Sequence, residues 1–215
     1  MPKVDVTLYA ITDNKAIGER DLFEAVEAAL QGGATLIQLR DKYADEGALI
    51  EEAKKLVGIC HRYGVPLIVN DNYKAAIAAG ADGVHVGIED TPVDEIRRMA
   101  GESFIIGATA KTVEQAKAAQ SAGADYLGVG AVFPSPTKTD AIRITNDMLR
   151  EIAASVDIPV AAIGGISKDN MRELCSCGAD GAALVSAVFA AEDIKAECRE
   201  LKKLSEQVFG KHQAE

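Results

Sequence analysis

Short apolar stretches alternate with longer segments of helical periodicity along this chain. Eight stretches predict strands, and they begin at Val6, Thr35, Pro66, Gly83, Phe104, Tyr126, Pro159 and Gly181. Between them, apolar residues recur every three or four positions, as in residues 21–31, 48–63 and 112–122, which predicts amphipathic helices. Alternating strands and helices favour parallel strands joined by right-handed crossovers. Eight such units predict an α/β fold, a single (β/α)8 TIM barrel over residues 1–215 whose last few residues form a frayed tail.

A short repeat supports the count of eight. The segment "GGAT" precedes the second predicted strand, and "AGADG", "AGADY" and "CGADG" precede the fourth, sixth and eighth. Glycine after a helix suits a left-handed cap, and the next residues suit a tight turn into a strand. We therefore predict structural roles for Asp82, Asp125 and Asp180 at the face of the barrel that serves stability. A doubly wound open sheet is the alternative, but no Gly-x-Gly-x-x-Gly follows the first predicted strand.

Composition narrows the possible classes of function. Apolar residues make up 48% of the chain, which indicates a globular protein. The net charge of −10 argues against a nucleic-acid-binding surface, which needs a basic stripe. The first residues lack a signal-peptide pattern and no apolar run is long enough to span a bilayer, so we expect a cytoplasmic protein without a membrane partner. The four cysteines lack zinc-site spacing and are expected to be reduced, apolar fillers.

The C-terminal ends of the predicted strands carry the candidate chemistry, because barrels place their active sites there. In "TLIQLRDK", the residues Gln38, Arg40 and Lys42 alternate, so a strand that ran through them would place all three on one face. The segments "IGGIS" and "LVSAVF" follow strands seven and eight, where barrels commonly bind phosphate through backbone N–H groups. Residues 135–138 add hydroxyls and an ammonium group. The pattern predicts two anion sites, one near strand two and one near strands seven and eight.

Two carboxylates, Asp71 and Asp90, follow adjacent predicted strands and suit one Mg²⁺. Magnesium usually takes one or two protein carboxylates and completes its shell with phosphate oxygens and water. Arg40 and Lys42 would then face a metal-bound diphosphate. Structural alternatives stay open, with Arg40 and Lys42 as solvated residues, Asp71 as a helix cap and Asp90 as a turn residue. His85, between two valines, is expected to lie in the core or line the barrel rather than act as a catalyst.

Taken in order, "YAITD", "IQLRDK", "VNDN", "GVHVG", "IGAT", "VFPSPTKTDA", "IGGI" and "GADGAALVSA" resemble the thiamine-phosphate synthase family. The resemblance implies a transferase that joins 4-amino-2-methyl-5-hydroxymethylpyrimidine diphosphate to a thiazole phosphate, carboxylated or not. The products would be thiamine phosphate and pyrophosphate. It implies small-molecule substrates and one Mg²⁺ per subunit, and it leaves open whether the protein is a homo-oligomer. In that family, Mg-bound pyrophosphate is thought to leave first, and the thiazole nitrogen then captures the pyrimidine methylene cation.

The resemblance also assigns roles to residues. It places Mg²⁺ on Asp71 and Asp90, and it implies catalytic roles for Arg40, Lys42, Thr109 and Lys138. The pyrimidine diphosphate would contact Gln38, Leu39, Arg40, Asp41, Lys42, Asn70, Thr109 and Lys138. The thiazole phosphate would contact Ser135, Pro136, Thr137, Gly165, Val185 and Ser186. The chain departs from the family pattern at Asn72, Ile88 and Thr109, where relatives commonly have arginine, glutamine and serine.

Other functions on the same barrel remain open from the sequence. A thiazole tautomerase would use a histidine where Lys111 stands and would lack the diphosphate-binding pattern. Sugar-phosphate epimerases and indole-forming enzymes share the loops after strands seven and eight but not the Q-x-R-x-K and P-x-P-T-K segments. A barrel without catalysis that binds thiamine intermediates is the third alternative, because fold does not fix function. Ile88 and Thr109 are the only features that favour it.

Overall fold

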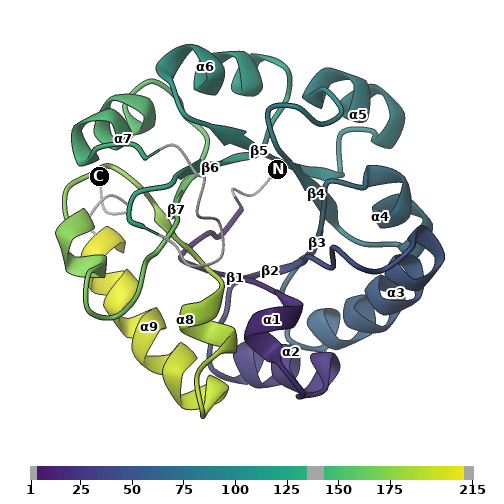
Figure 1. Ribbon diagram of the computed structural model, residues 1–215. Helices are drawn as coiled ribbons and strands as arrows, with labels where there is room; N and C mark the ends of the chain where they lie inside the picture. The colour runs from purple at the N-terminus through teal and green to yellow at the C-terminus, as the bar shows by residue number, and fades with distance from the viewer. Residues whose placement is uncertain (1–3, 135–142, 211–215) are drawn as a thin grey trace.

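The computed structural model describes residues 4–134 and 143–210, in which strands and helices alternate around a central ring (Figure 1). The strands are β1 (Leu8–Ile11), β2 (Leu36–Leu39), β3 (Leu67–Asn70), β4 (Gly83–Val86), β5 (Ile105–Ala110), β6 (Tyr126–Gly130), β7 (Val160–Ile163) and β8 (Gly181–Leu184). The helices are α1 (Asn14–Ile17), α2 (Leu22–Gln31), α3 (Glu46–Arg62), α4 (Tyr73–Ala79), α5 (Val93–Ala100), α6 (Val113–Ser121), α7 (Asn146–Ala153), α8 (Ser186–Phe189) and α9 (Ile194–Phe209), with a 3₁₀ turn, η1 (Met171–Leu174).

The eight strands are parallel and close into a barrel, because β8 pairs with β1 as well as with β7. The (β/α)8 barrel predicted from the alternating pattern is therefore confirmed. The sequence-based prediction of one domain over residues 1–215 extends beyond the described residues, as does the predicted tail. In the described part of the chain, no helix is long and apolar enough to cross a membrane.

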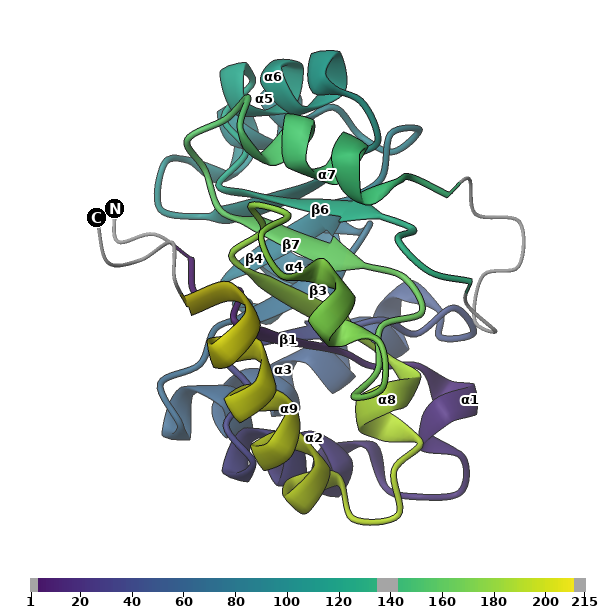
Figure 2. The same cartoon turned by 90° about the vertical axis from the view of Figure 1, so that its left-hand side faces the viewer.

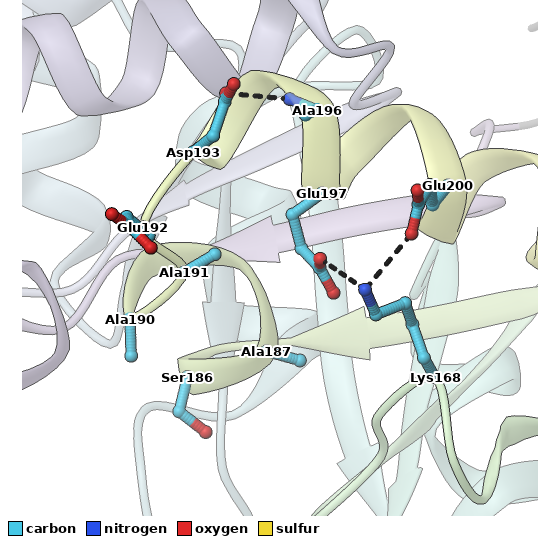
Figure 3. A pocket seen from close by; sticks show the side chains of 10 residues that line it. All are labelled: Lys168, Ser186, Ala187, Ala190, Ala191, Glu192, Asp193, Ala196, Glu197 and Glu200. Atoms are coloured by element: carbon cyan, nitrogen blue, oxygen red, sulfur yellow. Dashed lines mark hydrogen bonds and ion pairs between the residues drawn. The ribbon is translucent and has the colours of Figure 1, made fainter.

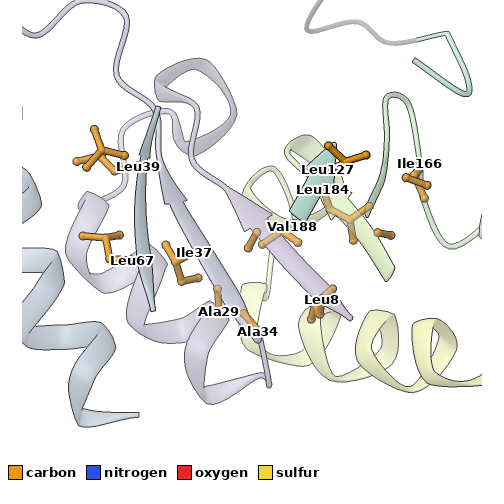
Figure 4. Close-up of a cluster of buried hydrophobic side chains, with 14 of the residues drawn as sticks. Leu8, Ala29, Ala34, Ile37, Leu39, Leu67, Leu127, Ile166, Leu184 and Val188 are labelled. Carbon is orange, nitrogen blue, oxygen red and sulfur yellow. The ribbon is translucent and has the colours of Figure 1, made fainter. Parts of the chain in front are cut away.

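Most of the larger helices begin at a side chain that satisfies their free backbone N–H groups. Asp45 caps α3, Thr112 caps α6 and Asp193 caps α9, and each side chain accepts a hydrogen bond from an N–H of the first turn. Such caps stabilise a helix by about 1 kcal/mol. The apolar faces of the helices pack on the outside of the barrel. Figure 4 shows part of this layer, which includes Leu8, Ile37 and Leu184 of the strands and Val188 of α8.

Strand residues alternate between this outer layer and the interior of the barrel. The interior cluster contains Tyr9, Leu36, Ile68 and Tyr126, all nearly inaccessible to solvent. Alternation also directs three polar residues inward, since Gln38, His85 and Thr109 share the inward parity of these positions. Polar side chains therefore replace apolar ones as the interior approaches the C-terminal ends of the strands.

The repeat before the even-numbered strands forms four equivalent contacts, which we call the entrance locks. Each lock joins a residue just before an even-numbered strand to a residue near the start of the preceding odd-numbered strand. The first residue donates its backbone N–H to the carbonyl of the second. The side-chain oxygen of the first residue accepts from the backbone N–H of the second. The pairs are Thr35 with Leu8 (2.9 Å), Asp82 with Leu67 (2.8 Å), Asp125 with Ile106 (2.7 Å) and Asp180 with Val160 (2.8 Å). The three aspartates have the structural role that was predicted.

Candidate active site

The C-terminal ends of the strands form one open end of the barrel, which we call the mouth. Figure 2 shows α1, which follows β1, and α8, which follows β8, at this same end. The sequence suggested a strand that runs on through Lys42, but β2 ends at Leu39. Gln38 is buried inside the barrel, whereas Arg40 and Lys42 lie in the loop beyond the strand, with Lys42 exposed. The shared strand face predicted for all three residues is therefore wrong.

The loop after β1 explains why the chain leaves the sheet at this point. The backbone N–H of Arg40 donates to the hydroxyl of Thr12 (2.8 Å) instead of continuing the ladder. The guanidinium of Arg40 then donates to the carboxylate of Asp13 (2.8 Å), and both side chains are largely buried. Asn14 donates to Asp41 (2.7 Å), which tightens the same contact. Residues 12–14 thus hold the loop of residues 40–41 at the mouth, with the guanidinium of Arg40 paired to Asp13.

Asp71 and Asp90 lie together at the ends of β3 and β4, as predicted. Burial and the neighbouring Asp90 raise the pKa of the Asp71 carboxyl to about 6, while hydrogen bonding from Asn70 and the charge of Arg40 act in the opposite direction. Asp71 also has a φ of 62°, an uncommon conformation for a residue with a side chain. Such strain persists where the surrounding structure enforces it, and it is frequent at functional sites.

The structural alternatives for these two carboxylates can be judged from their neighbours. Asp71 does not cap α4, because Asn72 does so by accepting from Ala75 N–H (2.9 Å). The residue that departs from the family pattern at position 72 is therefore a helix cap. Asp90 does have the predicted turn contact, since its carboxylate accepts from Gly87 N–H (2.7 Å). The Asp90 carboxylate also contacts that of Asp71.

The pair fits a divalent cation of the kind that needs few protein ligands. Two carboxylates in mutual contact repel one another, and a bound cation between them would relieve that repulsion. Within residues 4–134 and 143–210, no group of three or more His, Cys, Asp or Glu side chains could hold a metal. A site with only two carboxylates suits Mg²⁺, which draws its remaining ligands from phosphate and water.

The second predicted anion site is described only in part. Ser135, Pro136, Thr137 and Lys138 lie outside the described residues. Gly165, after β7, has a φ of 62°, and a Cβ there would lie 2.1 Å from the carbonyl oxygen of Pro134, so only glycine fits. Val185 and Ser186 follow the adjacent strand β8 at the start of α8. The loops after β6, β7 and β8 therefore meet beside the mouth.

The remaining predicted residues differ in whether their side chains or only their main chain could contact a ligand. The side chain of Leu39 packs in the outer apolar layer, so only its main chain is available at the mouth. Thr109 is half-buried and its hydroxyl contacts the imidazole of His85 (3.1 Å). Burial lowers the pKa of His85 to about 4, so its ring is neutral at pH 7. His85 thus lines the barrel, as expected from its place between two valines.

Sequence reasoning missed the residues that support the site from beneath and beside it. The sequence pattern gave Asp13 no predicted function, and it placed Tyr9 and Tyr126 in strands without any further role. The inward parity of both tyrosines, in strands whose other inward residues are small or apolar, is the signal that could have identified them. Tyr9 contacts Gln38, and Tyr126 contacts His85 (3.1 Å).

Neither of two hollows lined by described residues adds a second candidate site. One, of about 410 Å³, lies outside the barrel beside α8 and the start of α9 (Figure 3). The cation in its lining, Lys168, is already paired with Glu197 (2.7 Å) and Glu200 (3.0 Å). Another, of about 580 Å³, lies at the opposite end of the barrel, around Thr35 and Asp125 of the entrance locks.

Comparisons with known proteins point to one family. The family model described as thiamine monophosphate synthase matches residues 8–188. The chain is 45% identical over 199 residues to the thiamine-phosphate synthase of Alkaliphilus oremlandii, which covers 93% of this chain and 95% of the relative. It is 46% identical over 202 residues to that of Chloroflexus aurantiacus, covering 94% and 93%.

A solved structure extends the likeness to three dimensions. Thiamine phosphate pyrophosphorylase from Pyrococcus furiosus superposes with a TM-score of 0.88 at 43% identity, covering 96% of this chain and 98% of that one. A structure named native KDPGal, at 17% identity and a TM-score of 0.67, shares the fold alone. With a family model that matches residues 8–188 and relatives that are 45% and 46% identical over more than nine-tenths of the chain, this chain belongs to the thiamine monophosphate synthase family.

Proposed function

We propose that this chain is a Mg²⁺-dependent thiamine-phosphate synthase that joins the pyrimidine diphosphate to a thiazole phosphate and releases pyrophosphate. The observation that supports it most directly is the convergence of Arg40, Asp71 and Asp90 at one mouth of the barrel, in a chain of this family. A neutral ligand has no charge to pair with a guanidinium or with a cation held by two carboxylates. It suits a ligand that brings several negative charges and a divalent cation.

In this proposal the protein acts mainly on the leaving diphosphate. Asp13 and Thr12 already hold Arg40 at the mouth, so its guanidinium would be in place for the diphosphate oxygens. Lys42 and, from the sequence, Lys138 add positive charge. Preorganised charge of this kind lowers the barrier for a group that leaves with its electrons. The thiazole nitrogen already has a lone pair, so the reaction needs no strong general base.

Asp71 and Asp90 are the residues that would hold the Mg²⁺. When bound, the ion supplies positive charge that offsets the charge developing on the departing pyrophosphate. Asn70 stays beside this pair through its hydrogen bond to Asp71. Gln38 and Thr109, which both face inward near the mouth, would hold the pyrimidine ring. Gly165, Val185 and Ser186 would bind the thiazole phosphate together with residues 135–137.

A coupled assay of pyrophosphate tests the proposal. The protein is incubated with both phosphorylated precursors, with Mg²⁺ or with excess EDTA, and pyrophosphate and thiamine phosphate are measured together. We expect equal amounts of the two products, and only with Mg²⁺. A thiazole tautomerase would form neither product. A barrel that only binds these compounds would show binding of the precursors without release of pyrophosphate.

Substitution of Arg40 and Lys138 tests whether their positive charges act on the diphosphate. We expect Arg40→Ala and Lys138→Ala each to lower kcat/KM at least a hundredfold, about 3 kcal/mol at the transition state. The matched control is Arg62→Ala, because Arg62 forms an exposed ion pair with Glu27 far from the mouth. That variant should keep its activity. Near-normal turnover by either of the first two variants would remove that residue from the proposed role.

A further inference from the structure

Five polar side chains form a continuous hydrogen-bonded chain across the interior of the barrel. Gln38 donates through Nε2 to the hydroxyl of Tyr9, and the hydroxyls of Tyr9 and Tyr126 are 2.7 Å apart. The Tyr126 hydroxyl lies 3.1 Å from Nδ1 of His85, whose Nε2 lies 3.1 Å from the hydroxyl of Thr109. Both ends of this interior chain, Gln38 and Thr109, belong to the proposed pyrimidine site.

The barrel is built to make room for the interior chain. At Gly107 of β5, a Cβ would lie 2.2 Å from Cζ of Tyr126 and 2.5 Å from Nδ1 of His85. At Gly128 of β6, it would lie 3.0 Å from Cε1 of His85. Two inward positions thus lack side chains so that these two rings fit. Apolar side chains would fill the same space without needing partners, whereas buried polar groups are tolerated only when all are satisfied.

The direction of each hydrogen bond follows from the amide of Gln38, at one end of the interior chain. The amide nitrogen of Gln38 can only donate, so Tyr9 accepts from it and donates its own proton to Tyr126. The Tyr126 hydroxyl, which accepts from Tyr9, then donates to Nδ1 of His85. An imidazole that accepts at Nδ1 has its N–H on Nε2, which donates to the oxygen of Thr109. The proton of Thr109 remains for a ligand, as does the carbonyl oxygen of Gln38.

This direction is shared by the whole interior chain. If the amide of Gln38 turned over, Tyr9 would have to donate to it, and every later bond would reverse. The imidazole proton would move to Nδ1, Thr109 would donate inward, and the mouth would then present an amide N–H and a hydroxyl oxygen. The two ends therefore cannot change independently of one another.

We infer that Tyr9, Tyr126 and His85 are positioning residues that fix, as one unit, an accepting carbonyl at Gln38 and a donating hydroxyl at Thr109. This inference rests on the proposed function for the identity of its ligand. An aminopyrimidine offers an amino N–H beside a ring nitrogen that accepts, which is the complement of this pattern. The corresponding oxo ring offers an acceptor beside an N–H, which is the complement of the reversed pattern. In the stated direction the interior chain matches the amino form of the ring, and the oxo form would require all four of its hydrogen bonds to reverse together.

The tautomer of His85 tests the interior chain without any substrate. Two-bond ¹H–¹⁵N correlation spectra of the labelled protein at pH 7 distinguish a proton on Nε2 from one on Nδ1. His61→Gln and His212→Gln variants assign the signals, since the chain has three histidines. We expect the neutral Nε2–H tautomer at His85. The Nδ1–H tautomer or an imidazolium ion would overturn the inference, whatever the protein catalyses.

Substrate selectivity tests the consequence at the mouth. We compare kcat/KM for the 4-aminopyrimidine diphosphate and its 4-oxo analogue in the wild type, Tyr9→Phe and Tyr126→Phe. We expect the preference for the amino substrate to fall at least tenfold in both variants, because Gln38 and Thr109 are then no longer linked. Tyr63→Phe is the control, because the Tyr63 hydroxyl bonds to Glu27 outside the barrel (3.0 Å).

The outcomes separate this inference from the proposed function. An unchanged preference in Tyr9→Phe would overturn the positioning role, even if both variants lose turnover in general. A merely structural role would lower activity on both substrates equally. If the wild type releases no pyrophosphate from the amino substrate, the proposed function fails together with the ligand named here, and the His85 tautomer still decides whether the interior chain has the stated direction.

Discussion

At the scale of single residues, the site depends on how a few side chains are held rather than on which are present. Arg40 would be mobile at a loop position, but Asp13 and Thr12 fix it from the neighbouring loop. Asp13 also caps α1 by accepting from Ala16 N–H (3.1 Å), so its carboxylate serves both a helix and a cation. A position that looks like an ordinary helix cap in the sequence therefore also holds the guanidinium to which we assign the diphosphate.

The cysteines give a prediction at this scale. Cys60 and Cys198 are fully buried, and burial raises the pKa of each thiol to about 12. Cys177 is also buried, whereas Cys175 is exposed. The expectation of buried, apolar fillers thus holds for three of them and is wrong for Cys175. We expect iodoacetamide at pH 8 to add one group to the native protein and four in urea, as counted by intact mass.

The control for this labelling is a Cys175→Ser variant, which should gain no group in the native state. Thiolate is the reactive form, so buried thiols with a high pKa react only when the surrounding structure opens. More than one group on the native wild type within the same time would contradict the burial of the other three.

The sequence predicts much of the site at residue scale, and the reasons are geometric. Asp71 and Asp90 were correctly expected to meet, because parallel strands bring their C-terminal ends to one edge. The contact of Asp13 with Arg40 was not expected, because it depends on where β2 leaves the sheet. The interior chain was missed for a related reason. Its members lie on five different strands, and only the register of the closed barrel brings them together.

At the scale of elements, glycine has opposite roles inside a helix and inside the barrel. Gly58 lies on the exposed face of α3, and a Cβ there meets nothing within 4 Å. Gly107 lies in β5 against the rings of Tyr126 and His85. We expect Gly58→Ala to raise the free energy of unfolding by about 1 kcal/mol, since alanine favours the helix.

The matched substitution in the barrel should have the reverse effect. We expect Gly107→Ala to lower the free energy of unfolding by about 1–3 kcal/mol, because rings without free space cannot yield to an added methyl group. Urea unfolding followed by circular dichroism measures both variants. Equal stability of Gly107→Ala and the wild type would show that the two rings can shift, and the space argument for the interior chain would lose its support.

The sequence pattern predicts the bounds of the longer helices, but not those of the short ones. The predicted helices 21–31, 48–63 and 112–122 differ from α2, α3 and α6 by no more than two residues at either end. The short helices α1 and α8 and the turn η1 were not predicted as separate elements. A four-residue helix contains about one turn, so it has no apolar period that a pattern could reveal. These short pieces depend on neighbouring loops for their place.

At the scale of the whole molecule, closure of the barrel makes the fold cooperative. The pairing of β1 with β8 joins the two ends of the sheet, and α9 packs near α2 and β1. Removing any strand would expose two edges and part of the interior. The sequence-based prediction of one domain over residues 1–215 therefore has a direct consequence for unfolding.

We expect one thermal transition with the same midpoint for two probes. Far-ultraviolet circular dichroism follows the helices. Near-ultraviolet circular dichroism follows tyrosine packing, because the chain has no tryptophan and Tyr9 and Tyr126 are buried inside the barrel. Coincident curves are the test of two-state behaviour. Midpoints that differ beyond error would contradict a single domain.

The entrance locks indicate where the polypeptide can be divided without loss of a lock. Each lock binds an odd strand to the next even one, so a break between such pairs leaves all four intact. A cut after Gly101, between α5 and β5, would yield two pieces with two locks each. Co-expressed, these pieces should reassemble one to one and recover pyrophosphate release. A cut after Gly80 would separate Asp82 from Leu67, and its pieces should fail to complement.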